Sequence, residues 1–210
     1  PQNLNYLLND ELFNIKQYKK YLMTLPNPSG AIVLYAAIKR NALPASYSSH
    51  IQVKTNCLDS LFISISSEND GRAPIGEATL IASAFTDVNI WSDLESDQYF
   101  QKKDHYLSMI LQEIEKSLNI SSESWLHFEL ATPKTFAFWT GRSRGVVGGL
   151  GQHPNIFGPF GLSSRTPIEG LWLCGDSIYP GEGTAGVSQS SLIVCRQLLA
   201  QKGINLQIPL

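Results

Sequence analysis

The residues whose types and spacing could do chemistry lie near the end of the chain. Gly181, Gly183 and Gly186 form the pattern Gly-x-Gly-x-x-Gly, which brings backbone N–H groups close to a pyrophosphate in dinucleotide-binding units. The surrounding sequence does not fit such a unit, because residues 175–180 separate the glycines from the preceding apolar run and no acidic residue follows Glu182. The pattern therefore does not predict a binding site for the ribose of an adenosine.

The same segment nevertheless has the features of a ligand-binding edge. Gly175 would let the chain leave a strand tightly, and Asp176 would follow at the carboxyl end of that strand, where open α/β sheets bind their ligands. A helix that begins near Thr184 would direct N–H groups and a partial positive charge to the same place. Such an edge suits a pyrophosphate or the pyrimidine edge of a flavin. The alternative is a strand–helix connection whose glycines serve packing alone.

Periodicity predicts the elements that must position this segment. Residues 4–25 have helical spacing, and residues 97–118 form the clearest helix, with one apolar stripe broken by a lysine. Residues 171–174 are predicted to form a short strand and residues 187–201 a final helix. The other strand-like runs are rich in apolar or alternating residues and cover 31–38, 50–54, 61–66, 79–85 and 125–130.

The character of the sequence changes at about residue 138. Residues 1–138 are typical of a β-sheet with attached helices, and residues 139–210 are typical of a glycine-rich loop that leads into a strand–loop–helix unit. We therefore predict an α+β or α/β fold with these two regions as its domains.

The composition excludes several classes of protein. The chain has 210 residues, of which 43% are hydrophobic and 16% charged, so it can bury a sizeable core. Its net charge of −2, without a basic run, argues against nucleic acid as a partner. The 3 cysteines and 4 histidines are scattered, which predicts neither a disulfide framework nor a metal site. No apolar run is long enough to span a bilayer, and an internal, reducing compartment is the simplest interpretation.

Several other residues could take part in chemistry, each with a plainer alternative. Arg142 and Arg144 could bind carbonyl groups of a ligand or could anchor the glycine-rich loop that contains them. His153, in the same loop, could touch a substrate, although a structural role is favoured. Glu182 could act beside a ligand, but a solvated carboxylate at a helix start is favoured. Cys174 is predicted to be a buried apolar residue, and no residue is a convincing general base, so the catalytic residues are unknown.

The motifs of this chain resemble those of one protein family. The string LWLCGDSIYPGEGTAGVSQSS at 171–191 looks like the C-terminal flavin motif of the phytoene desaturase and carotenoid isomerase superfamily of FAD proteins. The glycine-rich loop at 139–152, together with 157–161, resembles one branch, the cyanobacterial-type carotenoid C-3',4' desaturases. Weaker likenesses at 28–30, 74–77 and 84–86 extend the resemblance over nearly the whole chain.

The resemblance implies FAD as the cofactor and assigns a role to each matching residue. Asp176 would bind the ribityl chain, Gly175 would lie beside the pyrophosphate, and the loop at 145–151 would lie near the flavin ring or the substrate. The implied cofactor-binding residues are Gly175, Asp176, Pro180, Gly181, Gly183, Thr184, Ala185, Gly186 and Val187. The implied residues of the substrate or flavin-face loop are Arg142, Arg144, Gly148, Gly149 and His153.

The resemblance also implies a function, an FAD-dependent oxidoreductase that introduces a double bond into a carotenoid. Two alternatives stay open: a carotenoid cis–trans isomerase on the same scaffold, and a non-catalytic truncated remnant or split-gene piece. The implied fold is the C-terminal portion of a two-domain FAD oxidoreductase. It would combine an antiparallel or mixed substrate-domain sheet with helices and the last strand and helix of a Rossmann-like FAD domain.

Two further expectations follow from the resemblance. The chain begins at Pro1 and has no N-terminal Gly-x-Gly-x-x-Gly unit, so we expect the missing nucleotide-binding half in the same protein or in a partner chain. The isolated chain would then bind FAD weakly or not at all and would be inactive. A carotenoid substrate implies peripheral attachment to a membrane on its cytoplasmic side, through the N-terminal helical region or through residues 99–118.

Overall fold

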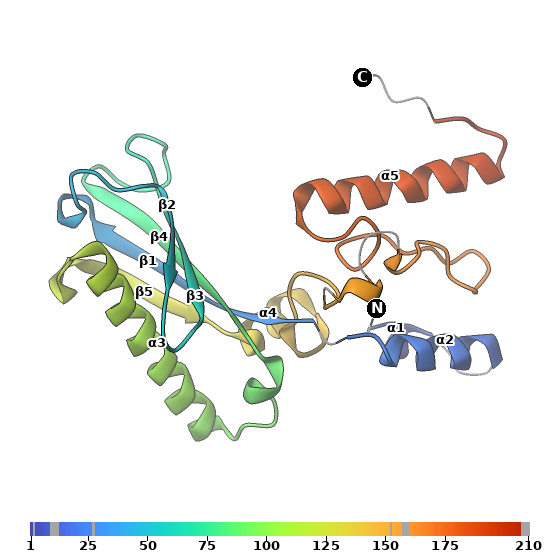
Figure 1. Ribbon diagram of the computed structural model, residues 1–210, viewed down its shortest axis with the longest axis horizontal. Helices are drawn as coiled ribbons and strands as arrows, with labels where there is room; N and C mark the ends of the chain where they lie inside the picture. The colour runs from blue at the N-terminus through green and yellow to red at the C-terminus, as the bar shows by residue number, and fades with distance from the viewer. Residues whose placement is uncertain (2, 9–12, 27, 152, 157–159, 207–210) are drawn as a thin grey trace. The chain divides into compact units, whose positions relative to one another are not determined.

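The computed structural model describes residues 1, 3–8, 13–26, 28–151, 153–156 and 160–206. The chain forms two compact units, which we call unit 1 (residues 1–29 and 147–210) and unit 2 (residues 30–146) (Figure 1). Within unit 2, Gly30 and Val146 form an antiparallel bridge, and within unit 1 the Val147 N–H donates to the Ser29 carbonyl at 2.8 Å. The predicted boundary between residues 138 and 139 concerns the domains of a longer protein and stays a prediction.

Unit 2 contains a five-stranded antiparallel sheet in the order β2-β3-β4-β1-β5. The predicted strands of this region are confirmed, with each end within two residues of the prediction. The strands are β1 (Gly30–Lys39), β2 (His50–Lys54), β3 (Ser60–Ile65), β4 (Glu77–Thr86) and β5 (Trp125–Ala131). The nearly continuous apolar sequence of β1 suits its place between β4 and β5, because a central strand is covered more fully than an edge strand.

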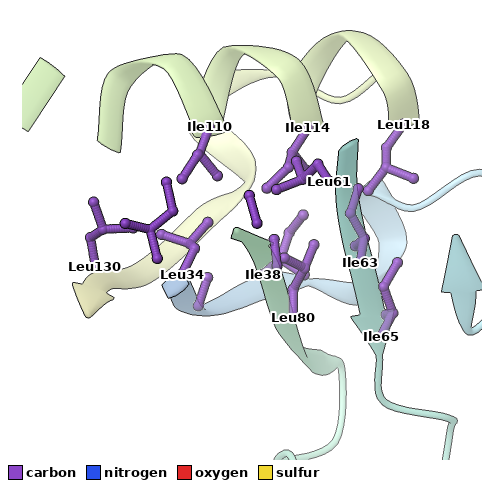
Figure 2. Close-up of a cluster of buried hydrophobic side chains, with 14 of the residues drawn as sticks. Leu34, Ile38, Leu61, Ile63, Ile65, Leu80, Ile110, Ile114, Leu118 and Leu130 are labelled. Atoms are coloured by element: carbon purple, nitrogen blue, oxygen red, sulfur yellow. The ribbon is translucent and has the colours of Figure 1, made fainter. Parts of the chain in front are cut away.

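Helix α3 (Ser96–Leu118) covers one face of this sheet. Its side chains Ile110, Ile114 and Leu118 are buried against apolar side chains of the strands, as Figure 2 shows. Asn119 ends the helix in the left-handed conformation, a common way to stop an α-helix. The apolar stripe predicted for residues 99–118 is therefore largely part of the core. This corrects the expectation that it forms a membrane-binding face.

Helix α4 (Pro133–Thr140) follows β5 and was not predicted. It begins with a capping box, in which Thr132 and Thr135 exchange hydrogen bonds, and with proline in its first turn. Four short 3-10 turns complete unit 2, at Arg40–Ala42, Val88–Trp91, Ser122–Ser124 and Ser143–Gly145.

Unit 1 joins the two ends of the chain around a second apolar core. It contains α1 (Leu4–Leu7), α2 (Phe13–Met23), a 3-10 turn at Pro154–Ile156, and α5 (Gly183–Gln201). The buried core side chains come from both ends of the sequence and are Leu4, Tyr18, Leu22, Leu150, Leu162 and Ile178. The N-terminal helices thus pack in the same core as Ile178, two residues after the candidate ligand-binding Asp176.

Two predictions for unit 1 need correction. Residues 171–174 form no strand; within 160–206 the structure has only a single bridge there, between Arg165 and Trp172. A strand needs a neighbouring strand for its ladder of hydrogen bonds, and this unit supplies none among its described residues. Helix α5 begins at Gly183, which confirms the start predicted near Thr184 and extends the predicted range 187–201 by four residues. Among all described residues, no helix combines the length and apolar content needed to cross a membrane.

Candidate functional site

The turn that carries Gly175 and Asp176 is fastened to the second turn of α5. The Gly175 N–H donates to the Ser190 hydroxyl at 2.9 Å, and the Ser190 hydroxyl lies 2.9 Å from the Val187 carbonyl oxygen. There is free space beside Gly175, because an added Cβ would meet no described atom within 4 Å. With φ at +116°, this position requires glycine. The turn is therefore anchored to α5 by its Gly175 N–H and has free space beside the Gly175 Cα, which a ligand can occupy.

The N-terminus of α5 provides a second polar surface. Gly183, Thr184 and Ala185 are exposed there, and the Glu182 side chain forms no capping hydrogen bond with the described residues. The first four N–H groups of an α-helix have no partners within the helix and carry a partial positive charge. Val187 lies one position beyond this group of four. The N–H groups of these exposed residues can therefore receive an anion or a carbonyl oxygen.

A small pocket brings the glycine-rich loop to Asp176. Its lining includes Gly148, Asp176, Gly181 and Glu182. Gly149 lies so close to the turn that an added Cβ would stand 2.6 Å from the carbonyl carbon of Asp176. The pocket has a volume of about 30 Å³, which is room for about one water molecule. It can hold a polar group of a ligand, but it cannot enclose a flavin ring.

The charges around the pocket indicate which part of a ligand fits there. Two carboxylates, Asp176 and Glu182, contribute to the lining, and no lysine or arginine is found among its described lining residues. Carboxylates accept hydrogen bonds from hydroxyl groups and repel phosphates. The pocket therefore fits a hydroxyl-bearing chain, and the N-terminus of α5 fits a phosphate or a carbonyl edge. FAD has both kinds of group, so the residues present fit this cofactor along an open surface.

Three of the predicted loop residues make local hydrogen bonds in the structure. Arg142 and Arg144 belong to unit 2, where the Arg144 guanidinium donates to the Asn89 side-chain oxygen at 2.7 Å. His153 is exposed, and its Nδ1 accepts the Asn155 N–H at 3.3 Å, so it supports a local turn. Residues 157–159 of the family-like motif lie outside the described residues.

One prediction near the pocket is wrong and one residue was missed. Cys174 is exposed rather than buried, because no sheet forms around residues 171–174 to cover it. The missed residue is Ser190, which is fully buried. Its position four residues before Val194, another buried residue of α5, could have indicated that Ser190 faces the same core. Residues four apart lie on one face of a helix.

Comparison with known proteins gives relatives in one enzyme class. No family model matches the chain. It is 31% identical over 151 residues to the chloroplastic prolycopene isomerase of Arabidopsis thaliana, which covers 70% of this chain and 25% of the relative. It is 29% identical over 156 residues to the chloroplastic prolycopene isomerase of Daucus carota, with coverage of 72% and 25%. It is 26% identical over 206 residues to prolycopene isomerase 1 of an Oncidium hybrid cultivar, and this match covers 92% of the chain and 34% of the relative.

These relatives support the superfamily that the motifs predicted, that of phytoene desaturases and carotenoid isomerases. Within it, the matched relatives are prolycopene isomerases, and they do not support the predicted closeness to C-3',4' desaturases. The chain spans 25% to 34% of the length of these curated relatives.

Proposed function

We propose that the chain is the C-terminal portion of an FAD-dependent enzyme that converts a carotenoid between its cis and trans forms. The observation that carries this proposal is the similarity to prolycopene isomerases over 70% to 92% of the chain. The open Gly175–Asp176 turn beside the N-terminus of α5 supports the cofactor. The nucleotide-binding half would lie in the same protein or in a partner chain.

The residues of unit 1 would hold the cofactor at two places. Asp176 would accept hydrogen bonds from ribityl hydroxyl groups, since it lines the acidic pocket. The exposed N–H groups of Gly183, Thr184 and Ala185 would face the pyrimidine edge of the ring and would stabilise negative charge there. FAD, when bound, would supply the chemistry at the polyene without net oxidation, and the residues of this chain would supply orientation and electrostatics.

Desaturation is the second candidate reaction. It is favoured by the glycine-rich loop at 139–152, which resembles the loop of carotenoid C-3',4' desaturases. The two reactions differ in mass balance, because isomerisation keeps all hydrogens of the carotenoid and desaturation removes two from it.

The test uses the complete gene product that contains this chain, loaded with FAD in its oxidised state and, in a parallel sample, in its reduced state, and supplied with prolycopene in lipid vesicles. We expect a product of unchanged mass and altered retention in chromatography. A product lighter by two hydrogens would assign desaturation instead. If the complete gene product does not bind FAD, the enzyme proposal fails and the alternative of a non-catalytic remnant is favoured. Asp176→Ala should weaken FAD binding, whereas Glu169→Ala, which removes an exposed carboxylate of the same unit, should not.

We also propose peripheral membrane attachment through the N-terminal helices, since a carotenoid is stored in lipid. Helix α1 exposes Tyr6 and Leu7, at 84% and 75% of their surfaces, and exposed apolar side chains of this kind can enter a lipid interface. Replacing both with serine should reduce co-sedimentation of the protein with phospholipid vesicles. Ile75→Ser is the matched control, because Ile75 is a fully exposed apolar residue of unit 2. Equal co-sedimentation of both variants would contradict the proposal.

A further inference from the structure

A single hydroxyl group joins the candidate cofactor turn to helix α5. Ser190 lies in the second turn of α5 and has none of its surface exposed. Its oxygen accepts the Gly175 N–H at 2.9 Å and lies 2.9 Å from the Val187 carbonyl oxygen and 3.3 Å from that of Gly175. A hydroxyl has one proton to donate, so it can serve only one of these carbonyls at a time while it accepts from Gly175.

The position of this hydroxyl sets the geometry of the whole turn. Ser190 holds the Gly175 N–H, and the space around an added Cβ at Gly175 is free of described atoms within 4 Å. Asp176 is the next residue and lines the pocket. The exposed N–H groups of the proposed cofactor site belong to the same helix as Ser190. The hydroxyl therefore links the two surfaces of that site, the carboxylate and the helix N-terminus.

We propose that Ser190 is a positioning residue for FAD, which fixes the Gly175–Asp176 turn relative to the N-terminus of α5. The inference rests on the proposed function. Without the hydroxyl, the Gly175 N–H loses its partner in α5, and the turn adopts other conformations for part of the time. Ligand affinity falls in proportion to the fraction of molecules that keep the binding-competent conformation.

A neighbouring serine provides a matched control. The Ser191 hydroxyl also donates to the Val187 carbonyl, at 3.0 Å, but Ser191 is exposed and its side chain makes no hydrogen bond with the turn among the described residues. Ser191→Ala thus removes a hydroxyl of the same kind, from the same helix turn and with the same carbonyl partner. Only Ser190→Ala also removes the link to Gly175.

The experiment measures FAD binding by the complete gene product and by its Ser190→Ala, Ser190→Thr and Ser191→Ala variants. Loss of one hydrogen bond of ordinary strength predicts a rise of about 3- to 10-fold in the Kd for FAD with Ser190→Ala. Ser191→Ala should stay within about 2-fold of the wild type. Ser190→Thr, which keeps the hydroxyl, should restore most of the affinity. The KM for FAD should rise in Ser190→Ala while kcat at saturating FAD stays close to that of the wild type.

The outcomes separate this inference from the proposed function. If the wild-type gene product binds no FAD, the proposed function fails and the inference fails with it. If the wild type binds FAD and Ser190→Ala binds it as tightly as Ser191→Ala does, the inference alone is overturned. A lower melting temperature of Ser190→Ala without FAD, at unchanged Kd, would likewise assign Ser190 a purely structural role. Should Ser190→Ala not fold, Ser190→Cys retains the side-chain volume with a weaker hydrogen-bonding group and carries the same prediction.

Discussion

Replacing Gly149 with alanine tests whether the glycine-rich loop and the Asp176 turn form one closely packed site. Gly149 has a φ of +76°, and an added methyl group would overlap the Asp176 carbonyl oxygen and lie 3.0 Å from the Ser177 nitrogen. The left-handed conformation costs an alanine about 1–2 kcal/mol, and overlap with backbone atoms adds about 1–3 kcal/mol. We expect Gly149→Ala to lower the free energy of unfolding by about 2–5 kcal/mol.

The matched control is Gly170→Ala, in the same unit. Gly170 has a φ of +78°, and an added Cβ would meet no described atom within 4 Å. This variant carries the conformational strain without the overlap, so its loss should be about 1–2 kcal/mol. Urea denaturation followed by far-UV circular dichroism measures both losses. Equal losses in the two variants would refute the close contact between Gly149 and Asp176.

Three further predictions concern the core and two ionisable groups. Ile114→Ala should lower the free energy of unfolding by about 2–5 kcal/mol, because Ile114 is fully buried, whereas Lys116→Ala on the same helix should change it by less than about 0.5 kcal/mol; urea denaturation tests both. Burial raises the pKa of the Tyr18 phenol, because the folded protein favours the neutral form. The contribution of this group to the free energy of unfolding is therefore fully present below about pH 10 and is lost as the pH rises through the raised pKa. Tyr18→Phe should reduce this alkaline loss of stability in thermal unfolding. The hydrogen bond from Arg72 lowers the pKa of Asp70. The contribution of the Asp70 carboxylate to stability is therefore present above about pH 4 and is lost as the pH falls through the lowered pKa. Asp70→Asn should reduce the loss of stability at acid pH, and an unchanged loss in this variant would contradict the prediction.

The sheet and its covering helix could be predicted because their signals are local. Strand β2 was predicted with the bounds it has, His50–Lys54, since polar and apolar residues alternate along it. Helix α3 was predicted within one residue at its start, since Ile110, Ile114 and Leu118 repeat at helical spacing. Helix α3 buries one face in the core, and β2 packs its half-buried Ile51 and Val53 against the same core; periodicity is informative where an element has one such face.

The rest of the fold depended on contacts or on weak propensities. Residues 171–174 have strand-like composition but find no strand partner among the described residues of unit 1. Helix α4 is only eight residues long, too short for a clear period, although Thr132 and Pro133 are recognisable helix-start signals. The first residues of α5 include two glycines, which form helices poorly, so the predicted range 187–201 starts later.

The candidate site was predictable in its residue types and less so in its geometry. Asp176 and the glycines could be identified because few residue types suit a close approach of backbone to a ligand. The packing of Gly149 on Asp176 and the bond from Gly175 to Ser190 join residues far apart in the sequence, and no local pattern reports such a contact. Unit 1 also combines both ends of the chain, which composition along the sequence cannot reveal.

The pairing of Gly30 with Val146 has a consequence for the order in which the chain folds. Unit 1 is built from two segments, and the whole of unit 2, residues 30–146, is inserted between them. While that insert is unfolded, joining the two segments means closing a very long loop, at an entropic cost on the order of 4 kcal/mol. Once unit 2 is folded, the bridge holds Gly30 beside Val146, and the insert acts as a short link. Mutations that unfold the sheet should therefore weaken the association of α2 with the segment that carries Asp176, although they touch neither.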